Sequence, residues 1–275
     1  MDQRNPAADW AERNLLAPSP GKSGRADLQV HTSYGDGMMS AREIFDYIER
    51  TRCLEVVAVT DHDDIRGALE ARETWAQGNY SFDFVPGVEV TTRSGHLLGL
   101  WVEEHIPSLR GLAETIERIH EVGGLAVIPH PFSMLTRSVG RRALDTLMSR
   151  GRPESRPDGI EVANPVTLGW HAGERAHVLN ARHWRLAETG GSDAHFIQVV
   201  GIAYTAFDGK TAAELRRELE AGRTEGVLAR KTPFREIGLR TLALQQYYGL
   251  SVTPKKLVEQ GLGALPWRRR QRARG

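Results

Sequence analysis

The sequence predicts an α/β fold built around a mostly parallel sheet, and three observations support this prediction. From Asp27 onward, short apolar runs of strand length alternate with segments of helical periodicity. Two of the helical segments open with a capping box, at Ser40 and at Thr211. Histidines and acidic residues follow several of the apolar runs directly, which is expected where parallel strands end at one face of a sheet.

The expected helices and strands alternate along the chain. Between the two capping boxes, helices are predicted at Gly67–Gln77, Leu112–Val122, Arg141–Arg150 and roughly Trp170–Leu186. After a first short strand near Asp27, strands are predicted at Leu54–Val59, Phe82–Val85, Leu97–Val102, Leu125–Ile128, Ile160–Val162 and Val200–Phe207. This order favours strands joined by helical crossovers, with helices covering the outside of the sheet.

The chain divides into three parts by pattern. Residues 1–24 show little periodicity and are interpreted as a loose N-terminal arm, residues 25–230 as one α/β domain, and residues 231–275 as a C-terminal extension. Of the 275 residues 40% are apolar and 26% are charged, which is typical of a globular protein. The chain shows neither an apolar run of membrane length nor a signal-peptide core, so a cytoplasmic protein is expected.

Charge is spread unevenly, although the net charge is only +1. Residues 251–275 contain seven lysines and arginines and one glutamate, which leaves the rest of the chain acidic overall. An acidic body argues against a positively charged coat that grips a nucleic-acid backbone. The arginine-rich end, residues 268–274, is either a solvated disordered tail or a contact for nucleic acid, and the sequence leaves both open.

The candidate chemical residues are of the types that bind divalent metals. Neutral imidazole and carboxylate suit such ions, and the single cysteine, Cys53, excludes a thiolate cage. Each residue alone has a structural explanation: Asp61 could cap a helix, Asp193 could form a turn, and His130 could be a rigid loop residue between two prolines. One shared polynuclear site explains them together. Its predicted members are His31, Asp36, His62, Glu89, His96, His130, Asp193 and His195.

These residues lie in short motifs that follow one another in a fixed order. The motifs are Asp27–Thr32 with Gly35–Gly37, Thr60–Asp63, Pro86–Glu89 with Gly95–Leu100, Ile128–Pro131, Ile160–Asn164 and Gly191–His195. In this order they resemble the motifs of the PHP (polymerase and histidinol phosphatase) domain family, in its small metal-dependent phosphoesterase type. The resemblance covers roughly residues 27–230.

The resemblance implies a distorted seven-stranded β/α barrel with two or three divalent ions (Zn, Mn, Fe or Mg) at the C-terminal strand ends. Glu89 would be shared by two of these ions. The resemblance groups the ligands as His31, Glu89 and Asp193 for one ion, Glu89, His96 and His130 for a second, and Asp36, His62 and His195 for a third.

The activity implied by the resemblance is metal-dependent hydrolysis of a phosphate ester by a metal-activated water. The substrate would be a phosphorylated small molecule, a nucleotide or an oligonucleotide. Glu89 and Asp193 are the expected catalytic residues, and Arg137 is either a phosphate contact or an exposed loop arginine. Hydrolysis of a non-phosphate bond remains an alternative, and the oligomeric state stays open.

Gln29 departs from the family pattern, which has histidine at this position. An amide carbonyl is a poorer zinc ligand than imidazole. Three outcomes are therefore open: Gln29 is a weak oxygen ligand, the site holds only two ions, or the ion at this position binds only together with substrate. A non-catalytic scaffolding domain is a further alternative. The other eight predicted ligands are all present, which favours the enzyme.

Overall fold

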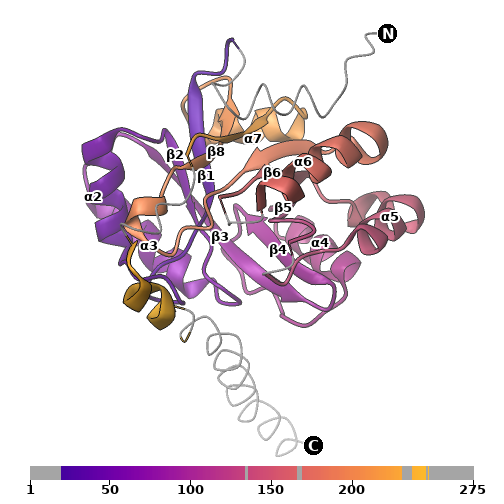
Figure 1. The fold of residues 1–275 in the computed structure, drawn as a ribbon, viewed down its shortest axis with the longest axis horizontal. Helices are drawn as coiled ribbons and strands as arrows, with labels where there is room; N and C mark the ends of the chain where they lie inside the picture. Colours follow the sequence, from indigo (N-terminus) through magenta and orange to yellow (C-terminus); the bar gives the residue numbers. More distant parts are fainter. Residues whose placement is uncertain (1–19, 134–135, 166–168, 231–236, 246, 248–275) are drawn as a thin grey trace, which may run out of the picture.

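The protein forms one α/β body around a single curved sheet (Figure 1). The computed structural model describes residues 20–133, 136–165, 169–230, 237–245 and 247. Most of the predicted N-terminal arm and the basic tail lie outside the described residues. Within the described part of the chain, no helix is long and apolar enough to cross a membrane.

Strands and helices alternate much as the sequence predicts. The strands are β1 (Gly24–Val30), β2 (Val56–Val59), β3 (Asp83–Thr92), β4 (Gly95–Leu100), β5 (Leu125–Ile128), β6 (Gly159–Ala163), β7 (Ala187–Gly190), β8 (Ala203–Phe207) and β9 (Glu225–Leu228). The helices are α2 (Ala41–Thr51), α3 (Arg66–Gln77), α4 (Leu112–Glu121), α5 (Arg141–Arg150), α6 (Gly169–Leu179) and α7 (Ala212–Glu220).

The strands form one sheet in the order β7-β6-β5-β4-β3-β2-β1-β8-β9. β1, β2 and β3 are parallel, as are β5, β6 and β7, whereas β4 runs antiparallel between β3 and β5. The predicted fold class is confirmed, with nine strands in the described residues in place of the seven that were expected. Because β3 and β5 are both antiparallel to β4, all six parallel strands end at the same face.

The two ends of the sheet approach each other, so the sheet curves into a nearly closed barrel. The backbone N–H of Gly190 on β7 donates to Thr205 Oγ1 on β8 at 3.0 Å, and the same hydroxyl donates to the Gly190 carbonyl at 2.9 Å. Gly226 on β9 packs so closely that an added Cβ would collide with the Thr189 carbonyl oxygen. Closure therefore depends on glycine where the backbones meet.

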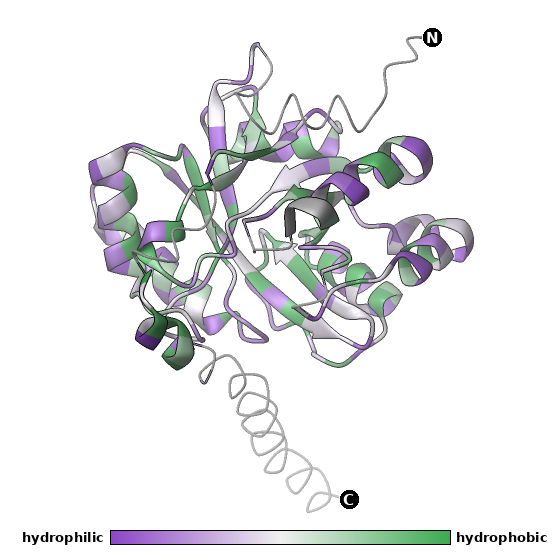
Figure 2. Ribbon diagram, viewed as in Figure 1, coloured by the Kyte–Doolittle hydropathy of each residue, from purple (hydrophilic) through white to green (hydrophobic). Residues whose placement is uncertain are grey.

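The helices cover the outside of the sheet. In Figure 1, α2 and α3 lie beside β1 to β3, and α4 and α5 lie beyond β4 and β5. The capping box at Ser40 is formed with Glu43, and it starts α2 with Ile44, Phe45 and Ile48 buried on one face. Figure 2 shows the same division, because the outer helix faces are hydrophilic and the strands carry most of the hydrophobic residues.

The predicted helix Trp170–Leu186 is shorter than expected. The α-helix α6 stops at Leu179, and a π-helical turn at Asn180–Trp184 ends at Arg185, which adopts a left-handed conformation with φ 57°. The Asn180 side chain bonds both the N–H and the carbonyl of Leu186, which satisfies the backbone groups at the helix end. Side-chain competition of this kind is not visible in the periodicity.

The β3–β4 hairpin is the other difference that matters for the site. β3 continues well past the predicted Phe82–Val85 to Thr92, so Glu89 lies within the strand and not after it. A tight turn then returns the chain as β4, with Thr92 paired with Gly95 and Thr91 with His96. His96 therefore stands at the start of an antiparallel strand, at the same face where the parallel strands end.

Candidate metal centre

All nine predicted ligand residues gather at the face where the parallel strands end. Gln29 lies near the end of β1, and His31 follows that strand directly. His62 follows β2 and forms an isolated bridge with Glu89 of β3. The remaining ligands come from the loop after β1, the start of β4 and the segments after β5 and β7; they are Asp36, His96, His130, Asp193 and His195.

Glu89 is the centre of the cluster, and each of its oxygens faces a different set of side chains. Its Oε1 lies 2.7 Å from His96 Nδ1 and 3.0 Å from His130 Nε2. Its Oε2 lies 2.9 Å from Gln29 Nε2 and 3.1 Å from His31 Nε2. A carboxylate whose two oxygens each face side-chain nitrogen atoms has the position required of a ligand shared by two ions.

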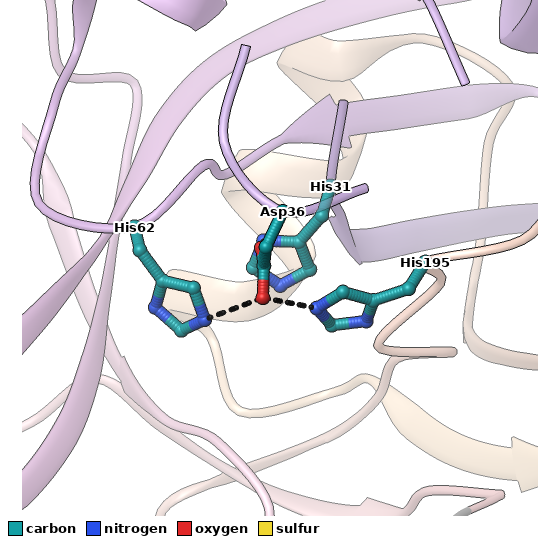
Figure 3. A group of neighbouring side chains, drawn as sticks. All are labelled: His31, Asp36, His62 and His195. Atoms are coloured by element: carbon teal, nitrogen blue, oxygen red, sulfur yellow. Dashed lines mark hydrogen bonds and ion pairs between the residues drawn. The ribbon is translucent and has the colours of Figure 1, made fainter. Parts of the chain in front are cut away.

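Asp36 is the centre of a second group, shown in Figure 3. Its Oδ2 lies 3.1 Å from His195 Nε2 and 3.9 Å from His62 Nε2. The His31 ring stacks on both of these imidazoles, with ring centroids 4.3 Å from His195 and 4.8 Å from His62. His31 also places Nε2 3.2 Å from Asp193 Oδ1, so it connects the Asp36 group with the Glu89 group.

Three sets of ligand atoms are each close enough to surround one ion. In each set the atoms lie within 4.8 Å of one another, and Glu89, His31 and His62 each belong to two sets. The sets are His31, Asp36, His62 and His195; His62, Glu89 and His96; and His31, Glu89 and Asp193. The third set matches the grouping implied by the family motifs, and the first contains the implied Asp36, His62 and His195 with His31 added. The second set differs, because it has His62 where the resemblance implies His130, which instead contacts Glu89 Oε1 at 3.0 Å.

The carboxylates and imidazoles shift one another's pKa values in opposite directions. Burial by itself raises the pKa of Glu89, but the charges of His62 and His96 hold it well below its usual range. Burial lowers the pKa of His130, yet its hydrogen bond and charge interaction with Glu89 raise it to about 9. Burial likewise opposes ionisation of Asp36, whose pKa is held far below normal by His195 and His62. The imidazoles therefore keep the carboxylate ligands ionised.

Unpartnered polar atoms show that this site fits metal ions. Among the described residues, eight buried side-chain N or O atoms have no hydrogen-bond partner, and six of them belong to the predicted ligands. They are Gln29 Oε1, His31 Nδ1 and Nε2, Asp36 Oδ1, His62 Nδ1 and His96 Nδ1. Two of them, His31 Nε2 and His96 Nδ1, lie 2.7–3.2 Å from carboxylate oxygens but lack the geometry of a hydrogen bond. Buried polar atoms normally make hydrogen bonds, so such a concentration indicates that these atoms are directed at a ligand.

Gln29 takes the position expected from the family pattern. Its side chain is fully buried and donates from Nε2 to Glu89, which leaves Oε1 without a hydrogen-bond partner. The amide oxygen is therefore available as a neutral donor toward a hard cation.

Three buried aspartates that were not among the predicted ligands hold the ligand loops in place. Each accepts both the backbone N–H and the hydroxyl of one serine or threonine, at 2.5–2.9 Å. The pairs are Asp27 with Ser192, Asp61 with Thr32, and Asp63 with Thr91. Each partner lies within two residues of a predicted ligand. Asp61 therefore orders the loop after β1 and does not cap α3, which begins at Arg66 after Ile65 at the N-cap position without a side-chain cap.

Glu161 is a further buried residue whose role the sequence did not predict. Its Oε2 accepts the backbone N–H of His130 at 2.6 Å and the Asn164 amide at 2.9 Å. Burial raises the pKa of this carboxyl to about 8. The only sequence signal for it was its place in the Ile160–Asn164 motif, and Glu161 lies within β6 and not after a strand end.

Arg137 contributes its backbone to the site. Its carbonyl accepts the N–H of His96 at 2.7 Å, while the residue itself is exposed. The loop around it also supplies Ser138, whose hydroxyl lies 3.1 Å from His130 Nδ1. A phosphate contact by the Arg137 guanidinium stays a prediction.

Comparisons with known proteins agree with this geometry. Residues 176–224 match the family model described as PHP-associated. An uncharacterized protein of Methanocaldococcus jannaschii is 36% identical over 51% of this chain and 81% of its own length. A crystal structure of a two-domain protein from Bacteroides vulgatus, containing a predicted PHP-like metal-dependent phosphoesterase, has a TM-score of 0.53 at 17% identity, covering 74% of this chain and 64% of that one. The chain belongs to the PHP domain family.

Two relatives with named activities match shorter segments. The phosphoribosyl 1,2-cyclic phosphate 1,2-diphosphodiesterase of Eggerthella lenta is 35% identical over 34% of this chain and 37% of its own length. The 5'-3' exoribonuclease Rnm of Salmonella typhimurium is 30% identical over 36% of this chain and 35% of its own length.

Proposed function

We propose that this protein is a metal-dependent phosphoesterase that hydrolyses a phosphate monoester or a nucleotide or oligonucleotide phosphate ester. The observation that carries this proposal is the three ligand groups, which are linked because they share Glu89 and His31. Six buried atoms of the predicted ligands also make no hydrogen bond. Both relatives with named activities act on phosphate esters, which supports the same reaction class.

Each part of the site has a distinct role in this proposal. Divalent ions held by these ligands would activate a water and neutralise charge on the phosphate and the leaving oxygen. The side chains of His31 and Glu89 are at most 1% exposed, so these two residues form the buried inner part of the site. The side chains of His62, His96, Asp193 and His195 are 10–14% exposed, so a substrate phosphate would approach from the side of these four residues.

The ligand set also argues for the enzyme over a scaffold. A domain that only docks on a polymer has no need for buried unpartnered imidazoles, because each unsatisfied buried group costs about 1–3 kcal/mol. Four imidazole nitrogens, one amide oxygen and one carboxylate oxygen without a hydrogen bond at one place favour a site that holds cations. The basic residues 268–274, which lie outside the described part of the chain, remain either a solvated tail or a proposed contact for nucleic acid.

The test is elemental analysis of the purified protein together with a phosphate-release screen over nucleotides, sugar phosphates and short oligonucleotides. We expect divalent metal in the wild type, release from at least one phosphorylated class, and loss of both in His31→Ala. The matched control is His105→Ala, which changes an exposed histidine outside the cluster. Metal-free wild-type protein after incubation with Zn²⁺ or Mn²⁺, or equal activity of the two variants, would contradict the proposal.

A further inference from the structure

A short helical segment from the C-terminal extension packs against the body of the protein next to the Asp36 group. Residues 239–245 are helical and are drawn in gold in Figure 1. Ile237, just before them, is 6% exposed and belongs to the main hydrophobic core, and Leu242 packs against that core. Leu239 faces away and is 86% exposed. One side of the segment therefore packs on the protein through Ile237 and Leu242, while Leu239 and Leu244 are exposed.

Gln245 continues the packed face of this segment, three residues after Leu242. Its side chain is 7% exposed, and its Nε2 lies 3.5 Å from Asp36 Oδ2. That oxygen also faces His195 and His62, as described above. An amide from the C-terminal extension thus reaches a carboxylate of the candidate metal centre across 209 positions of sequence.

Asp36 needs such support because it lies in a loop and not on a strand. The loop is held by backbone bonds, from the Gly37 N–H to the Thr32 carbonyl at 2.9 Å and from the Met38 N–H to the His195 carbonyl at 2.9 Å. These bonds set the path of the chain but leave the Asp36 side chain to be oriented by its neighbours. A ligand that points correctly before the ion arrives binds it more tightly, which is the usual role of partners outside the ligand set.

We propose that Gln245 is a positioning residue for Asp36, donating its amide N–H to Oδ2 and orienting the carboxylate toward His62 and His195. A neutral donor suits this role. A lysine would neutralise the negative charge that a cation requires, and a glutamate would repel Asp36. The contact makes the C-terminal segment part of the candidate metal centre, although it lies outside the part of the chain that resembles the family motifs.

This inference rests on the proposed metal-binding function, and its test separates the two. Metal-free, full-length protein is titrated with Mn²⁺ alone, by calorimetry and by electron paramagnetic resonance. Gln245→Met keeps the length and packing of the side chain but removes the donor. Loss of a partner outside the ligand set typically costs about 10–100-fold in metal affinity. We expect a weakening of that size at one Mn²⁺ position, with the others and the melting temperature unchanged.

Two further variants make the result decisive. Gln245→Asn keeps the amide but withdraws it by one methylene, so it should weaken the same position, and it replaces the first variant if Gln245→Met fails to fold. Leu239→Met changes the exposed side of the same segment and should bind as the wild type does. Wild-type affinity at every position in both Gln245 variants overturns the inference while leaving the proposed function intact. Weakening at all positions equally overturns it too, because that indicates general loosening. No Mn²⁺ bound to the wild type overturns both.

Discussion

Replacing Glu89 by glutamine should disable the metal centre without changing its shape. The substitution keeps the size of the side chain but removes its charge and one of its two equivalent oxygens. In the structure both oxygens are used, Oε1 against His96 and His130 and Oε2 against Gln29 and His31. The amide can satisfy one side at most, since its NH2 group would face either two imidazoles or the Gln29 amide.

The interaction energy lost on removing the Glu89 charge follows from the pKa of His130. Burial lowers this pKa, so the rise from 6.5 to about 9 is due mainly to Glu89. Without the carboxylate charge, we expect the His130 pKa in the metal-free protein to return to 6.5 or below. A fall of about 2.5 pH units corresponds to roughly 3 kcal/mol of interaction. Phosphate release should fall by more than about 100-fold, because loss of a partner outside the ligand set already costs about 10–100-fold.

The assay combines a histidine titration by nuclear magnetic resonance in metal-free protein with metal content and phosphate release. The matched control is Glu188→Gln on β7, which removes a carboxylate 2.8 Å from His177 away from the candidate site. The control should leave the His130 pKa and the metal content unchanged. A His130 pKa near 9 in Glu89→Gln, or undiminished activity with normal metal content, refutes the reasoning.

Three other predictions concern the same face of the protein. Gln29→His should raise metal occupancy under limiting metal and shift preference from Mn²⁺ or Mg²⁺ toward Zn²⁺, since imidazole replaces a weak oxygen donor; unchanged occupancy and preference by elemental analysis would show that Gln29 is not a ligand. Asp61→Asn leaves either the N–H or the hydroxyl of Thr32 facing an amide donor, so urea unfolding of metal-free protein should show a loss of about 1–3 kcal/mol; an unchanged midpoint argues against the loop-holding role. Metal binding at pH 7 should release protons, because His130 is protonated below its pKa of about 9 and must be neutral to bind. Affinity should therefore rise with pH up to about 9. Calorimetry in buffers of different ionisation enthalpy measures the release, and an affinity independent of pH between 7 and 9 contradicts it.

Much of the fold and most of the ligand set could be predicted from the sequence because the signals are local. The capping box of Ser40 and Glu43 involves residues three apart, and the apolar face of α2 repeats every three or four residues. His31, His62 and His130 each follow an apolar run within two or three residues. The general rule that parallel strands end at one face was then enough to place these histidines together.

Only the tertiary structure decided which distant residues support that site. The reversal of β4 brings His96 beside Glu89, and the closure of the sheet brings Ser192 to Asp27 across 165 positions. Gln245 meets Asp36 only because the C-terminal segment folds back onto the body. Such contacts join residues that leave no mark on each other's local pattern, since a buried aspartate or glutamine looks the same in sequence whatever it faces. The metal-binding residue types are therefore readable along the chain, whereas the partners that orient them follow from the path of the chain in space.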